Sequence, residues 1–495
     1  MSSANTFEST LFKACLRTLE LPGSVEETVA GDPERNWDAI AQAFDGISTI
    51  VVVGYSSQGP AHAQNLRDTF AAKGIHIQVK VALRADSPTR ERARDDGFTE
   101  ANGTLVTPED GLAAADVAIM LISDQAMALE GERYLGLLPK GAAVGLAHGF
   151  YLGYLGATGG KIRTDLTVVG VCPKGMGPSV RKLYEQGSGI NASFAVHQTP
   201  KGQEDRARDL ALGWALGIGA PFTFQTTLES EWRSDIFGER AILLGGVHGI
   251  VETLYGWKLS QGVEPERAYM ETVESLVRPI SQIISKEGLA SVYDTLDAAG
   301  KGEFEVAYNA AYPVMRDLMA KIYRDVSSGR EIVEVVEDGA NDDPMLNVSA
   351  TDMWLVGEQV RAKQAKELEG YDHIDPTTAG VYIAGMVAQV DTLRAQGHEW
   401  SEVVNESIIE AVDSLNPFMR KKGIGFMVDN CSITARRGDR KWAPLFRARS
   451  DQAIVPILAG REQSGSNSFA GFKGHDVHAA LKTLSELRPP VDIAV

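Results

Sequence analysis

The chain has 495 residues, of which 44% are hydrophobic and 23% charged, a composition typical of a globular protein with more than one domain. Its formal net charge of -18 argues against binding to nucleic acid or to an anionic lipid surface, because both need a basic face. Three cysteines, Cys15, Cys172 and Cys431, are too few for a disulfide framework and favour a reducing compartment.

Neither a membrane anchor nor a targeting segment is recognisable in the sequence. No stretch reaches the roughly 18 apolar residues that a membrane-spanning helix needs. Residues 1–10 lack the basic, apolar or arginine-rich pattern of a leader. We therefore expect a cytoplasmic protein with no membrane or nucleic-acid partner. A plastid or mitochondrial protein whose presequence has been removed is the alternative.

Short β-branched runs alternate with polar helical stretches between residues 47 and 198. Strands are expected over six runs: Ile50–Val53, Ile77–Leu83, Val117–Ile122, Ala142–Leu146, Leu166–Val171 and Phe194–His197. Such continuous apolar runs are typical of a parallel sheet with helices on both faces. Residues 1–226 are therefore predicted to form a doubly wound α/β, Rossmann-like domain.

After Thr226 the strand signal fades and the pattern becomes helical. Long amphipathic helices are expected over five segments: Ala241–Trp257, Glu266–Ser285, Phe304–Tyr323, Thr377–Ala395 and Ser401–Val412. The second half of the chain is thus predicted to be all-α.

The helical half repeats itself at an offset of 139 residues. The matched blocks are Val251–Leu254 with Val390–Leu393, Val273–Leu276 with Val412–Leu415, and the single residues Gly246 and Glu271 with Gly385 and Glu410. Common helix usage explains part of the match, but two blocks in one register favour internal duplication. We expect two helical repeats, 227–365 and 366–495, with a loop at Glu337–Val348.

Gly54-Tyr55-Ser56-Ser57-Gln58-Gly59 follows the first strong strand and opens a helix. In dinucleotide-binding loops such glycines permit a tight turn and close approach to the pyrophosphate at the helix N-terminus. Ser56 stands where the fingerprint has its middle glycine, and an ordinary glycine-bearing turn is the alternative. The position between strand and helix favours a dinucleotide site.

Arg84, Ser87 and Thr89 follow the second strand, where an NAD site usually carries a carboxylate. An arginine with hydroxyl neighbours suits the 2′-phosphate of NADPH instead. Asp86 lies in the same loop, so the preference between NADPH and NADH stays open, and a solvated loop of mixed charge is the alternative.

Two pairs of carboxylates are spaced four residues apart, Asp235 with Glu239 and Glu406 with Glu410. On a helix each pair lies on one face, where like charges repel unless a cation compensates. Oxygen ligands of this kind suit Mg²⁺, and four could hold two ions. Either pair alone also fits a solvated helix face.

His148 and Lys174 each end a predicted strand. The carboxyl ends of parallel strands are where open α/β sheets bind ligands, so both residues are catalytic candidates. A structural histidine and a surface lysine are the alternatives.

Four motifs resemble ketol-acid reductoisomerases of the long, plant-like type, and the resemblance extends from about Phe7 to the end of the chain. The motifs are the segments 172–181 (CPKGMGPSVR), 189–198 (GINASFAVHQ), 235–239 (DIFGE) and 429–436 (DNCSITAR). The resemblance implies two Mg²⁺ ions bound by four carboxylates: Asp235, Glu239, Glu406 and Glu410. It implies catalytic roles for His148 and Lys174 and a substrate contact for Ser432.

The same resemblance implies an NADPH site made of these residues: Gly54, Tyr55, Ser56, Ser57, Gln58, Arg84, Ser87, Thr89, Ser123, Asp124, Gln125 and Gly177. It also implies that the duplicated helical half forms a knotted domain, and that the protein is a homodimer or homotetramer.

The implied reaction is a step of valine, leucine and isoleucine biosynthesis. An alkyl group of 2-acetolactate or 2-aceto-2-hydroxybutyrate migrates, and hydride from NADPH then reduces the product. Two divalent ions can acidify the hydroxyl and polarise the ketone, with Glu410 as the candidate proton relay. A plain NADP-dependent hydroxyacid dehydrogenase, which needs no metal, and a nucleotide-binding regulator are the alternatives.

Overall fold

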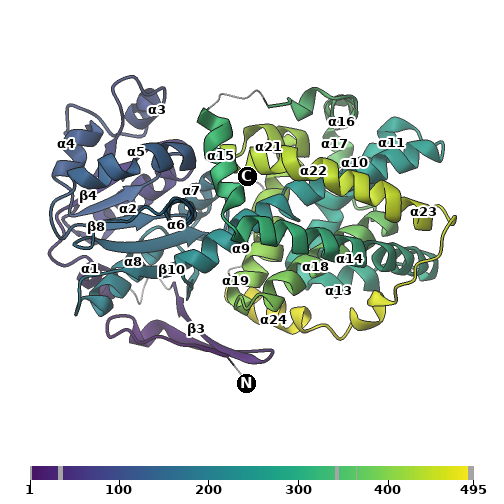
Figure 1. Ribbon diagram of the computed structural model, residues 1–495, viewed down its shortest axis with the longest axis horizontal. Coiled ribbons are helices and arrows are strands. Elements are labelled where there is room, and N and C mark those ends of the chain that lie inside the picture. The colour runs from purple at the N-terminus through teal and green to yellow at the C-terminus, as the bar shows by residue number, and fades with distance from the viewer. Residues whose placement is uncertain (1–2, 32–36, 341–344, 364, 489–495) are drawn as a thin grey trace. The chain divides into compact units, whose positions relative to one another are not determined.

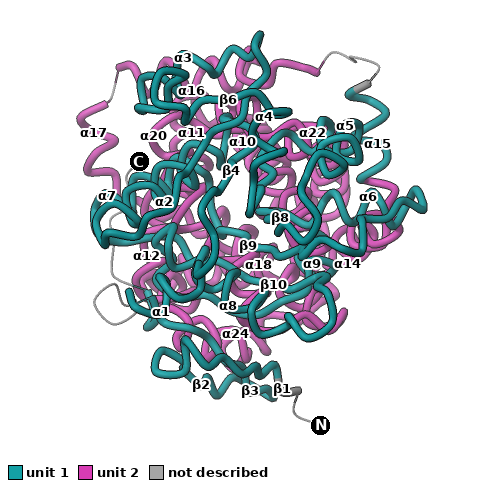
Figure 2. The backbone as a smooth tube through the Cα atoms, turned by 90° about the vertical axis from the view of Figure 1, so that its left-hand side faces the viewer, with its two compact units in different colours: residues 1–232, 332–341, 486–491 teal, residues 233–331, 342–485, 492–495 magenta. Residues whose placement is uncertain are grey.

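The computed structural model describes residues 3–31, 37–340, 345–363 and 365–488. The chain divides into two compact units, coloured teal and magenta in Figure 2. Unit 1 comprises residues 1–232, 332–341 and 486–491, and unit 2 comprises residues 233–331, 342–485 and 492–495.

Unit 1 is an α/β unit built on one 11-stranded sheet (Figure 1). Its strands are β1 (Ser3–Asn5), β2 (Leu16–Leu21), β3 (Ser24–Ala30), β4 (Thr49–Val53), β5 (Gln78–Ala82), β6 (Leu105–Val106), β7 (Val117–Met120), β8 (Ala143–Leu146), β9 (Thr167–Pro173), β10 (Ala192–Gln198) and β11 (Phe222–Gln225). Its helices are η1 (Lys13–Cys15), α1 (Trp37–Ala43), α2 (Gly59–Lys73), α3 (Arg90–Asp95), α4 (Pro108–Ala113), α5 (Asp124–Leu137), α6 (Phe150–Thr158), α7 (Gly177–Glu185) and α8 (Glu204–Gly217).

The predicted doubly wound core is confirmed. Neighbouring strands run in the order β6-β5-β4-β7-β8-β9, and every pair among them is parallel. Side chains alternate between the faces: Ile50 and Val52 pack with helices α1, α2 and α8. Val51 and Val53 pack with α4, α5 and α6 on the other face. Burial on both sides is why these strands are apolar throughout.

The prediction of a purely parallel sheet is wrong for the strand at Phe194–His197. It lies within β10, which pairs antiparallel with β9 and parallel with β11. Residues 192–195 are buried like their parallel neighbours. An uninterrupted apolar run reports burial, which both directions of pairing share, and therefore cannot report strand direction.

An N-terminal hairpin extends this sheet and is absent from the sequence prediction. Strand β3 pairs antiparallel with β2 along one edge and antiparallel with β11 along the other. Its interior carries Glu26 and Glu27, acidic residues that are depleted in strands, so the local sequence hides it. Glu26 is nevertheless buried, and Glu27 accepts a 2.9 Å hydrogen bond from the amide of Phe7.

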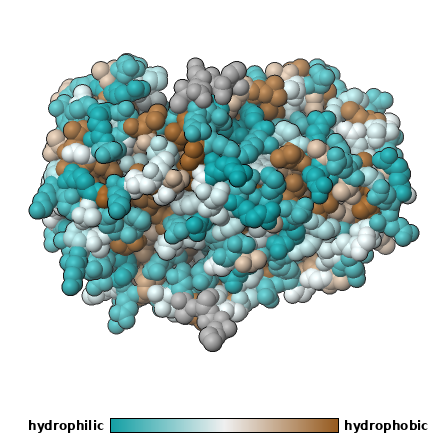
Figure 3. Space-filling view, in the orientation of Figure 1, coloured by the Kyte–Doolittle hydropathy of each residue, from teal (hydrophilic) through white to brown (hydrophobic). Residues whose placement is uncertain are grey.

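Unit 2 is helical, with no strand among its described residues. The helices that follow unit 1 along the chain are α9 (Leu228–Arg240), α10 (Gly245–Ser260), α11 (Pro265–Tyr269), η2 (Met270–Glu274), η3 (Leu276–Ile280), α12 (Ser281–Glu287), α13 (Leu289–Asp294), α14 (Ala298–Ser327), α15 (Arg330–Ala340), η4 (Val348–Ala350), α16 (Asp352–Lys363), α17 (Ala365–Glu369), α18 (Pro376–Ala395), α19 (Trp400–Val404), η5 (Asn405–Ile409), η6 (Ala411–Leu415), α20 (Asn416–Lys422), α21 (Ile424–Asn430), α22 (Ile433–Ala453), α23 (Val455–Leu458), η7 (Ser468–Gly471) and α24 (Asp476–Ser485). Helices α9 and α15 contribute residues to both units. Within the described ranges no helix has the length and apolarity to cross a membrane, and hydrophilic side chains dominate the face drawn in Figure 3.

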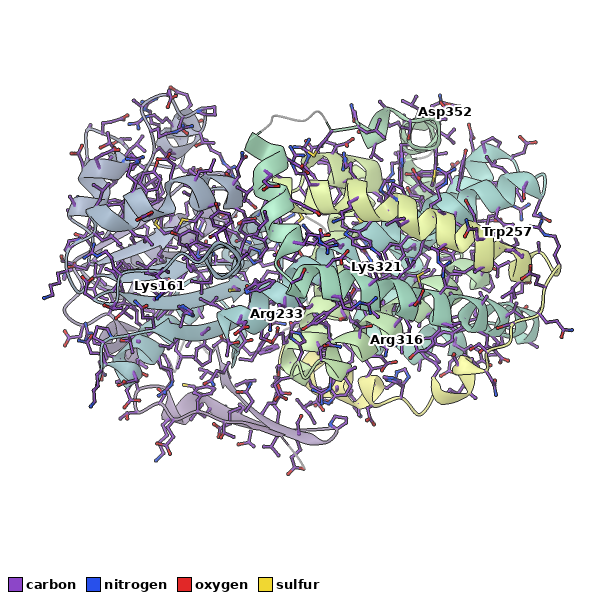
Figure 4. All side chains as sticks on the ribbon, viewed as in Figure 1. Lys161, Arg233, Trp257, Arg316, Lys321 and Asp352 are labelled. Atoms are coloured by element: carbon purple, nitrogen blue, oxygen red, sulfur yellow. The ribbon has the colours of Figure 1, made fainter. Side chains whose placement is uncertain are left out.

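Two helix pairs organise unit 2, α10 with α22 and α14 with α18 (Figure 1). Each pair joins one helix from residues 227–365 to one from residues 366–495. Arg316 on α14, labelled in Figure 4, donates a 2.7 Å hydrogen bond to Thr392 on α18. The division into two repeats and the knotted path stay predictions.

Two helical predictions need correction. Helix α18 is buried on every side over Thr377–Val390, so its segment is a central helix rather than an amphipathic one. The loop expected at Glu337–Val348 begins later, because α15 continues to Ala340. Residues 341–344 of that loop lie outside the described residues.

Unit 2 contains two pairs of consecutive π-helical turns, which the sequence does not predict. Helices η2 and η3 are separated by Ser275, and η5 and η6 are separated by Glu410. The second pair begins at Asn405, 135 residues after Met270 begins the first. Wide turns of this kind occur often at functional sites.

The 135-residue register differs from the 139-residue offset of the sequence blocks. Residues four apart share one face of a helix, so a slip of four preserves the buried face and short blocks match in either register. By position in the π-helical pairs, Glu271 corresponds to Glu406, and Ser275 corresponds to Glu410.

Candidate active site

The loop between β4 and α2 has the close contacts that a dinucleotide-binding turn requires. Gly54 has φ 102°, and a Cβ there would lie 2.3 Å from the carbonyl oxygen of Leu121. A Cβ on Gly59 would lie 2.3 Å from the carbonyl oxygen of Gly54. Both positions therefore need glycine, and the amino end of α2 stands directly behind the loop.

Between these glycines, Tyr55 is buried and its hydroxyl donates a 2.8 Å hydrogen bond to Asp96. Burial, with the neighbouring Asp96 carboxylate, raises the pKa of Tyr55 well above its usual range, so the phenol stays neutral. Ser56 and Ser57 are exposed. Hence Ser56, at the middle position of the fingerprint, presents its side chain to solvent rather than to the core.

The turn between β9 and α7 packs against this loop. The amide of Gln58 donates a 2.9 Å hydrogen bond to the carbonyl of Gly175. A Cβ on Gly177 would lie 2.1 Å from the carbonyl oxygen of Ser57. The structure thus brings Gly177 to the loop, as the resemblance implied.

The loop after β5 carries the residues predicted to bind a 2′-phosphate. The side chain of Arg84 is 70% exposed, with its Nε 3.8 Å from Asp86. The hydroxyls of Ser87 and Thr89 lie 3.0 Å apart. Arg90 has a structural role instead, since its guanidinium donates to the carbonyl of Leu83 at 2.8 Å. Arg84 is therefore the arginine of this loop that faces solvent.

Ser123 caps helix α5, its hydroxyl accepting a 3.3 Å hydrogen bond from the amide of Ala126. Asp124 and Gln125 begin that helix after β7. The predicted nucleotide residues therefore follow β4, β5, β7 and β9 at the carboxyl edge of the sheet. That edge is where open α/β sheets bind their ligands.

His148 and Lys174 follow β8 and β9, and a third residue, Glu231, joins them. The His148 Nδ1 lies 3.2 Å from one Glu231 oxygen, and the Lys174 Nζ lies 3.6 Å from the other. The Gly149 amide donates a 2.6 Å hydrogen bond to the same carboxylate. The side chains of Lys174 and Glu231 are 1% and 2% exposed, so their charges compensate each other within the fold.

Burial alone would raise the pKa of Glu231, but the charges of His148 and Lys174 and the hydrogen bond from Gly149 outweigh it and lower the pKa to about 2. Glu231 is thus an anion at neutral pH that holds two cationic or proton-donating side chains. The sequence analysis missed it, although a signal existed. Glu231, Asp235 and Glu239 are spaced by four along α9.

Three of the four predicted metal ligands meet in unit 2. Oxygens of Asp235, Glu406 and Glu410 lie within 4.8 Å of one another. Glu406 is fully buried and the other two are half-buried. The carbonyl of Glu406 accepts a 3.0 Å hydrogen bond from Gln389, which fixes this turn of η5. Three carboxylates at this separation form an oxygen-donor set that fits Mg²⁺.

Glu239 lies one turn further along α9 than Asp235 and pairs with Arg240, whose Nη1 is 2.9 Å away. Arg240 is fully buried and also bonds Glu331 at 3.1 Å. The Glu239 carboxylate therefore sits beside the cluster's helix with a fixed cationic neighbour.

Ser432 caps helix α22, with its hydroxyl accepting a 3.0 Å hydrogen bond from the amide of Ala435. The neighbouring Cys431 is packed into the fold. Its burial, with the charges of Glu239 and Asp439, raises the pKa of the thiol far above its usual range. Cys431 is thus an unreactive packing residue.

A doubly wound nucleotide-binding unit and a helical unit with a buried carboxylate cluster define a dinucleotide-dependent oxidoreductase of two domains. Residues 47–222 match a family model described as acetohydroxy acid isomeroreductase, NADPH-binding domain. Residues 228–366 match one described as ketol-acid reductoisomerase, C-terminal domain. The chain belongs to the ketol-acid reductoisomerase family, and it is an enzyme that combines oxidoreductase and isomerase activities.

Two chloroplastic ketol-acid reductoisomerases are similar to this chain along its length. The Pisum sativum protein is 44% identical over 99% of this chain and 85% of its own. The Spinacia oleracea protein is 45% identical over 100% and 84%. A solved NADH-preferring ketol-acid reductoisomerase from an uncultured archean shares the fold, with a TM-score of 0.57 and 23% identity over 68% of this chain and 98% of its own.

Proposed function

We propose that this chain converts 2-acetolactate or 2-aceto-2-hydroxybutyrate into the 2,3-dihydroxy-3-methyl acid, by Mg²⁺-dependent alkyl migration followed by reduction with NADPH. This is a step of valine, leucine and isoleucine biosynthesis. The observation that carries the proposal is the cluster of Asp235, Glu406 and Glu410 in a chain of this family. A plain dehydrogenase has no use for such a cluster.

In this proposal Asp235, Glu406 and Glu410 hold the divalent ions, and Glu239 supplies the fourth carboxylate. The bound ions would supply positive charge that acidifies the substrate hydroxyl and polarises its ketone. Glu410, half-buried at the junction of η5 and η6, takes up and returns the hydroxyl proton. Ser432 binds the substrate.

Lys174 and His148 act on the reacting oxygen atoms as hydrogen-bond donors. Both are oriented by the Glu231 carboxylate, which keeps the Lys174 ammonium charged despite its burial. Such preorganised donors stabilise negative charge that develops on a carbonyl oxygen.

The reductant binds over the glycine loop, with its pyrophosphate at the amino end of α2. Arg84, Ser87 and Thr89 receive the 2′-phosphate. Asp86 near Arg84 weakens this preference through its charge. Replacing Arg84 by Ala is expected to raise KM for NADPH at least tenfold and leave KM for NADH unchanged. An equal loss with both cofactors would remove Arg84 from this role.

The test is NADPH oxidation with 2-acetolactate, with and without Mg²⁺, in the wild type, in Asp235→Asn and in Glu303→Gln. Glu303 is an exposed carboxylate on α14 and serves as the matched control. Turnover that needs Mg²⁺, falls at least 100-fold in Asp235→Asn and persists in Glu303→Gln supports the proposal. Metal-free turnover of a hydroxy acid would favour the dehydrogenase instead.

Two further assignments belong to the same proposal. The relatives named chloroplastic support a plastid location over the cytoplasmic one, which a fluorescent fusion in plant cells would test. The active protein is a homodimer or homotetramer, and light scattering would give its mass in solution.

A further inference from the structure

A buried lysine in unit 2 bridges two carboxylates. The Nζ of Lys258, near the end of α10, lies 2.7 Å from Glu271 and 2.6 Å from Asp375. The three side chains are each about one-tenth exposed. Trp257, the preceding residue, is labelled in Figure 4. This cluster takes no part in the function proposed above.

The Lys258 cluster occupies the repeat-related counterpart of the carboxylate cluster. Glu271 is the second residue of η2, and Glu406 is the second residue of η5. Ser275 separates the first π-helical pair just as Glu410 separates the second. Ser275 also belongs to the cluster, because its hydroxyl accepts a 2.9 Å hydrogen bond from the amide of Asp375.

Two differences reduce the number of carboxylates at the counterpart. Ser275 stands in place of Glu410. The segment that precedes α18, residues 371–375, is extended rather than helical and supplies one carboxylate, Asp375, where α9 supplies Asp235 and Glu239 before α10. Two carboxylates therefore remain where the other repeat has four.

We propose that the Lys258 ammonium takes the place of a divalent cation in this counterpart, so that unit 2 holds one metal centre per chain although its helices are duplicated. The one-centre statement rests on the metal site proposed above, whereas the assignment of Lys258 rests on its own contacts.

The charge and geometry of the cluster carry this assignment. An ammonium is a compact point charge with three donors, and two carboxylates at 2.6–2.7 Å satisfy it as they would satisfy a small cation. Asp375 is further held by its role as the cap of α18, accepting a 2.8 Å hydrogen bond from Thr378. Arg267, a mostly exposed residue, balances the second oxygen of Glu271 at 2.6 Å. Two cations thus neutralise two carboxylates without a metal.

Removing the ammonium should expose the cation-binding capacity of the remaining carboxylates. The variant Lys258→Ala leaves room for a hydrated ion between Glu271 and Asp375. Mn²⁺ bound per chain is counted by calorimetric titration, and melting is recorded in EDTA and in Mn²⁺. Both are done in an Asp235→Asn background, which weakens the proposed metal site. Lys363→Ala removes an exposed lysine with one surface partner and is the control.

Lys258→Ala is expected to bind one more Mn²⁺ per chain than its background. In EDTA its melting temperature should fall by roughly 5–10 °C, because two buried carboxylates lose their counter-charge, and Mn²⁺ should restore most of that loss. Lys363→Ala should change neither value. A Lys258→Ala protein whose Mn²⁺ count and Mn²⁺ response equal those of its background overturns the proposal.

If Lys258→Ala does not fold in EDTA, it is refolded and purified in Mn²⁺. The double variant Lys258→Ala/Glu271→Gln then supplies the decisive comparison. It should fold without metal and lose the extra Mn²⁺, because a single carboxylate remains. Retention of the extra ion in this variant would place it elsewhere and refute the assignment. A wild type that binds no Mn²⁺ would contradict the proposed function and leave the Lys258 comparison intact.

Discussion

The buried Lys174 ammonium depends on one carboxylate. Glu231 lies 3.6 Å from it, and both side chains are almost completely enclosed. A lysine charge in such a place persists only when an anion compensates its lost hydration. Glu231 therefore sets the charge state of Lys174 and, through Nδ1, the orientation of His148.

Replacing Glu231 by Gln should reduce both stability and turnover. The amide keeps the shape but removes the charge, so unfolding free energy should fall by about 2–4 kcal/mol and kcat by about 10–100-fold. Urea titration and NADPH-oxidation kinetics measure the two effects. Glu229→Gln, an exposed change two residues earlier on α9, should alter neither. Full activity in Glu231→Gln would dismiss the orienting role.

At this scale the sequence predicts residues whose chemistry is visible in a short motif. His148, Lys174 and the carboxylate pairs stand at strand ends or at helical spacing, and the structure brings His148 to Lys174, and Asp235 to Glu406 and Glu410. Glu231 escaped because its partners lie more than 50 residues away along the chain. Only the spacing of four to Asp235 pointed to it.

Close helix crossings in unit 2 depend on single glycines. A Cβ on Gly249 of α10 would lie 2.6 Å from the carbonyl oxygen of Ala443 and 2.6 Å from the Cβ of Phe446 on α22. Gly380 of α18 stands equally close to Phe304 on α14. Neither backbone can move away without separating its helix pair.

Gly249→Ala is expected to destabilise the protein by about 1–3 kcal/mol because the added methyl has no space. At Gly256, on the same helix, an added methyl would have no atom within 4 Å, so Gly256→Ala should stabilise by about 0.5–1 kcal/mol through helix propensity. Urea unfolding of both variants gives the comparison. Equal effects of the two changes would argue against a close crossing.

His248 links the same two helices electrostatically. Its Nδ1 lies 2.9 Å from Asp439 on α22, and its Nε2 lies 3.1 Å from Glu252. Burial alone would lower the pKa of His248, but the two carboxylates outweigh it and raise the pKa from 6.5 to about 9. The protonated ring therefore stabilises the fold fully below pH 6.5, and this contribution disappears as the pH rises through 9.

The pH dependence of stability should report this link. Between pH 6.5 and pH 9 the wild type is expected to lose up to roughly 3 kcal/mol that His248→Gln does not lose. Urea unfolding across this pH range measures the difference between the two proteins. His76→Gln, at an exposed position, should follow the wild type. Parallel curves for wild type and His248→Gln would rule out a raised pKa.

Element prediction succeeded where burial leaves a period in the sequence. Strand β4 has an unbroken β-branched run, and α14 has a clear helical period. Strand β3 was missed because its acidic residues contradict local propensity and its pairing partners are distant. The π-helical turns were missed because a fifth residue per turn leaves no distinct pattern of residue types, and the structure gives no physical account of where they start.

The whole molecule separates its two proposed ligands by unit. The nucleotide-binding loops belong to unit 1, and the carboxylate cluster belongs to unit 2. A ligand stabilises the unit that binds it by mass action, about 2.7 kcal/mol at 100 times its dissociation constant. The duplication within unit 2 was predictable from sequence, but its register was not, because a four-residue slip preserves a helix face.

Calorimetric melting should therefore resolve the two ligands. NADPH is expected to raise one transition and Mg²⁺ another, each by several degrees. Asp235→Asn should lose the Mg²⁺ shift and keep the NADPH shift, and Arg84→Ala should show the reverse. If both ligands move a single common transition, the units unfold together and the separate assignment by unit fails.

The hairpin of β2 and β3 has a consequence for the colloidal behaviour of the protein. It covers the outer edge of β11, and its own outer strand, β2, carries Arg17 and Glu20 as exposed charges. Charged edge strands discourage other chains from adding to a sheet. A chain trimmed before Gly31 would bare β11, whose residues 222–224 are buried. We expect such a chain to self-associate through that edge, visible as concentration-dependent light scattering, so the acidic hairpin works as a guard against aggregation.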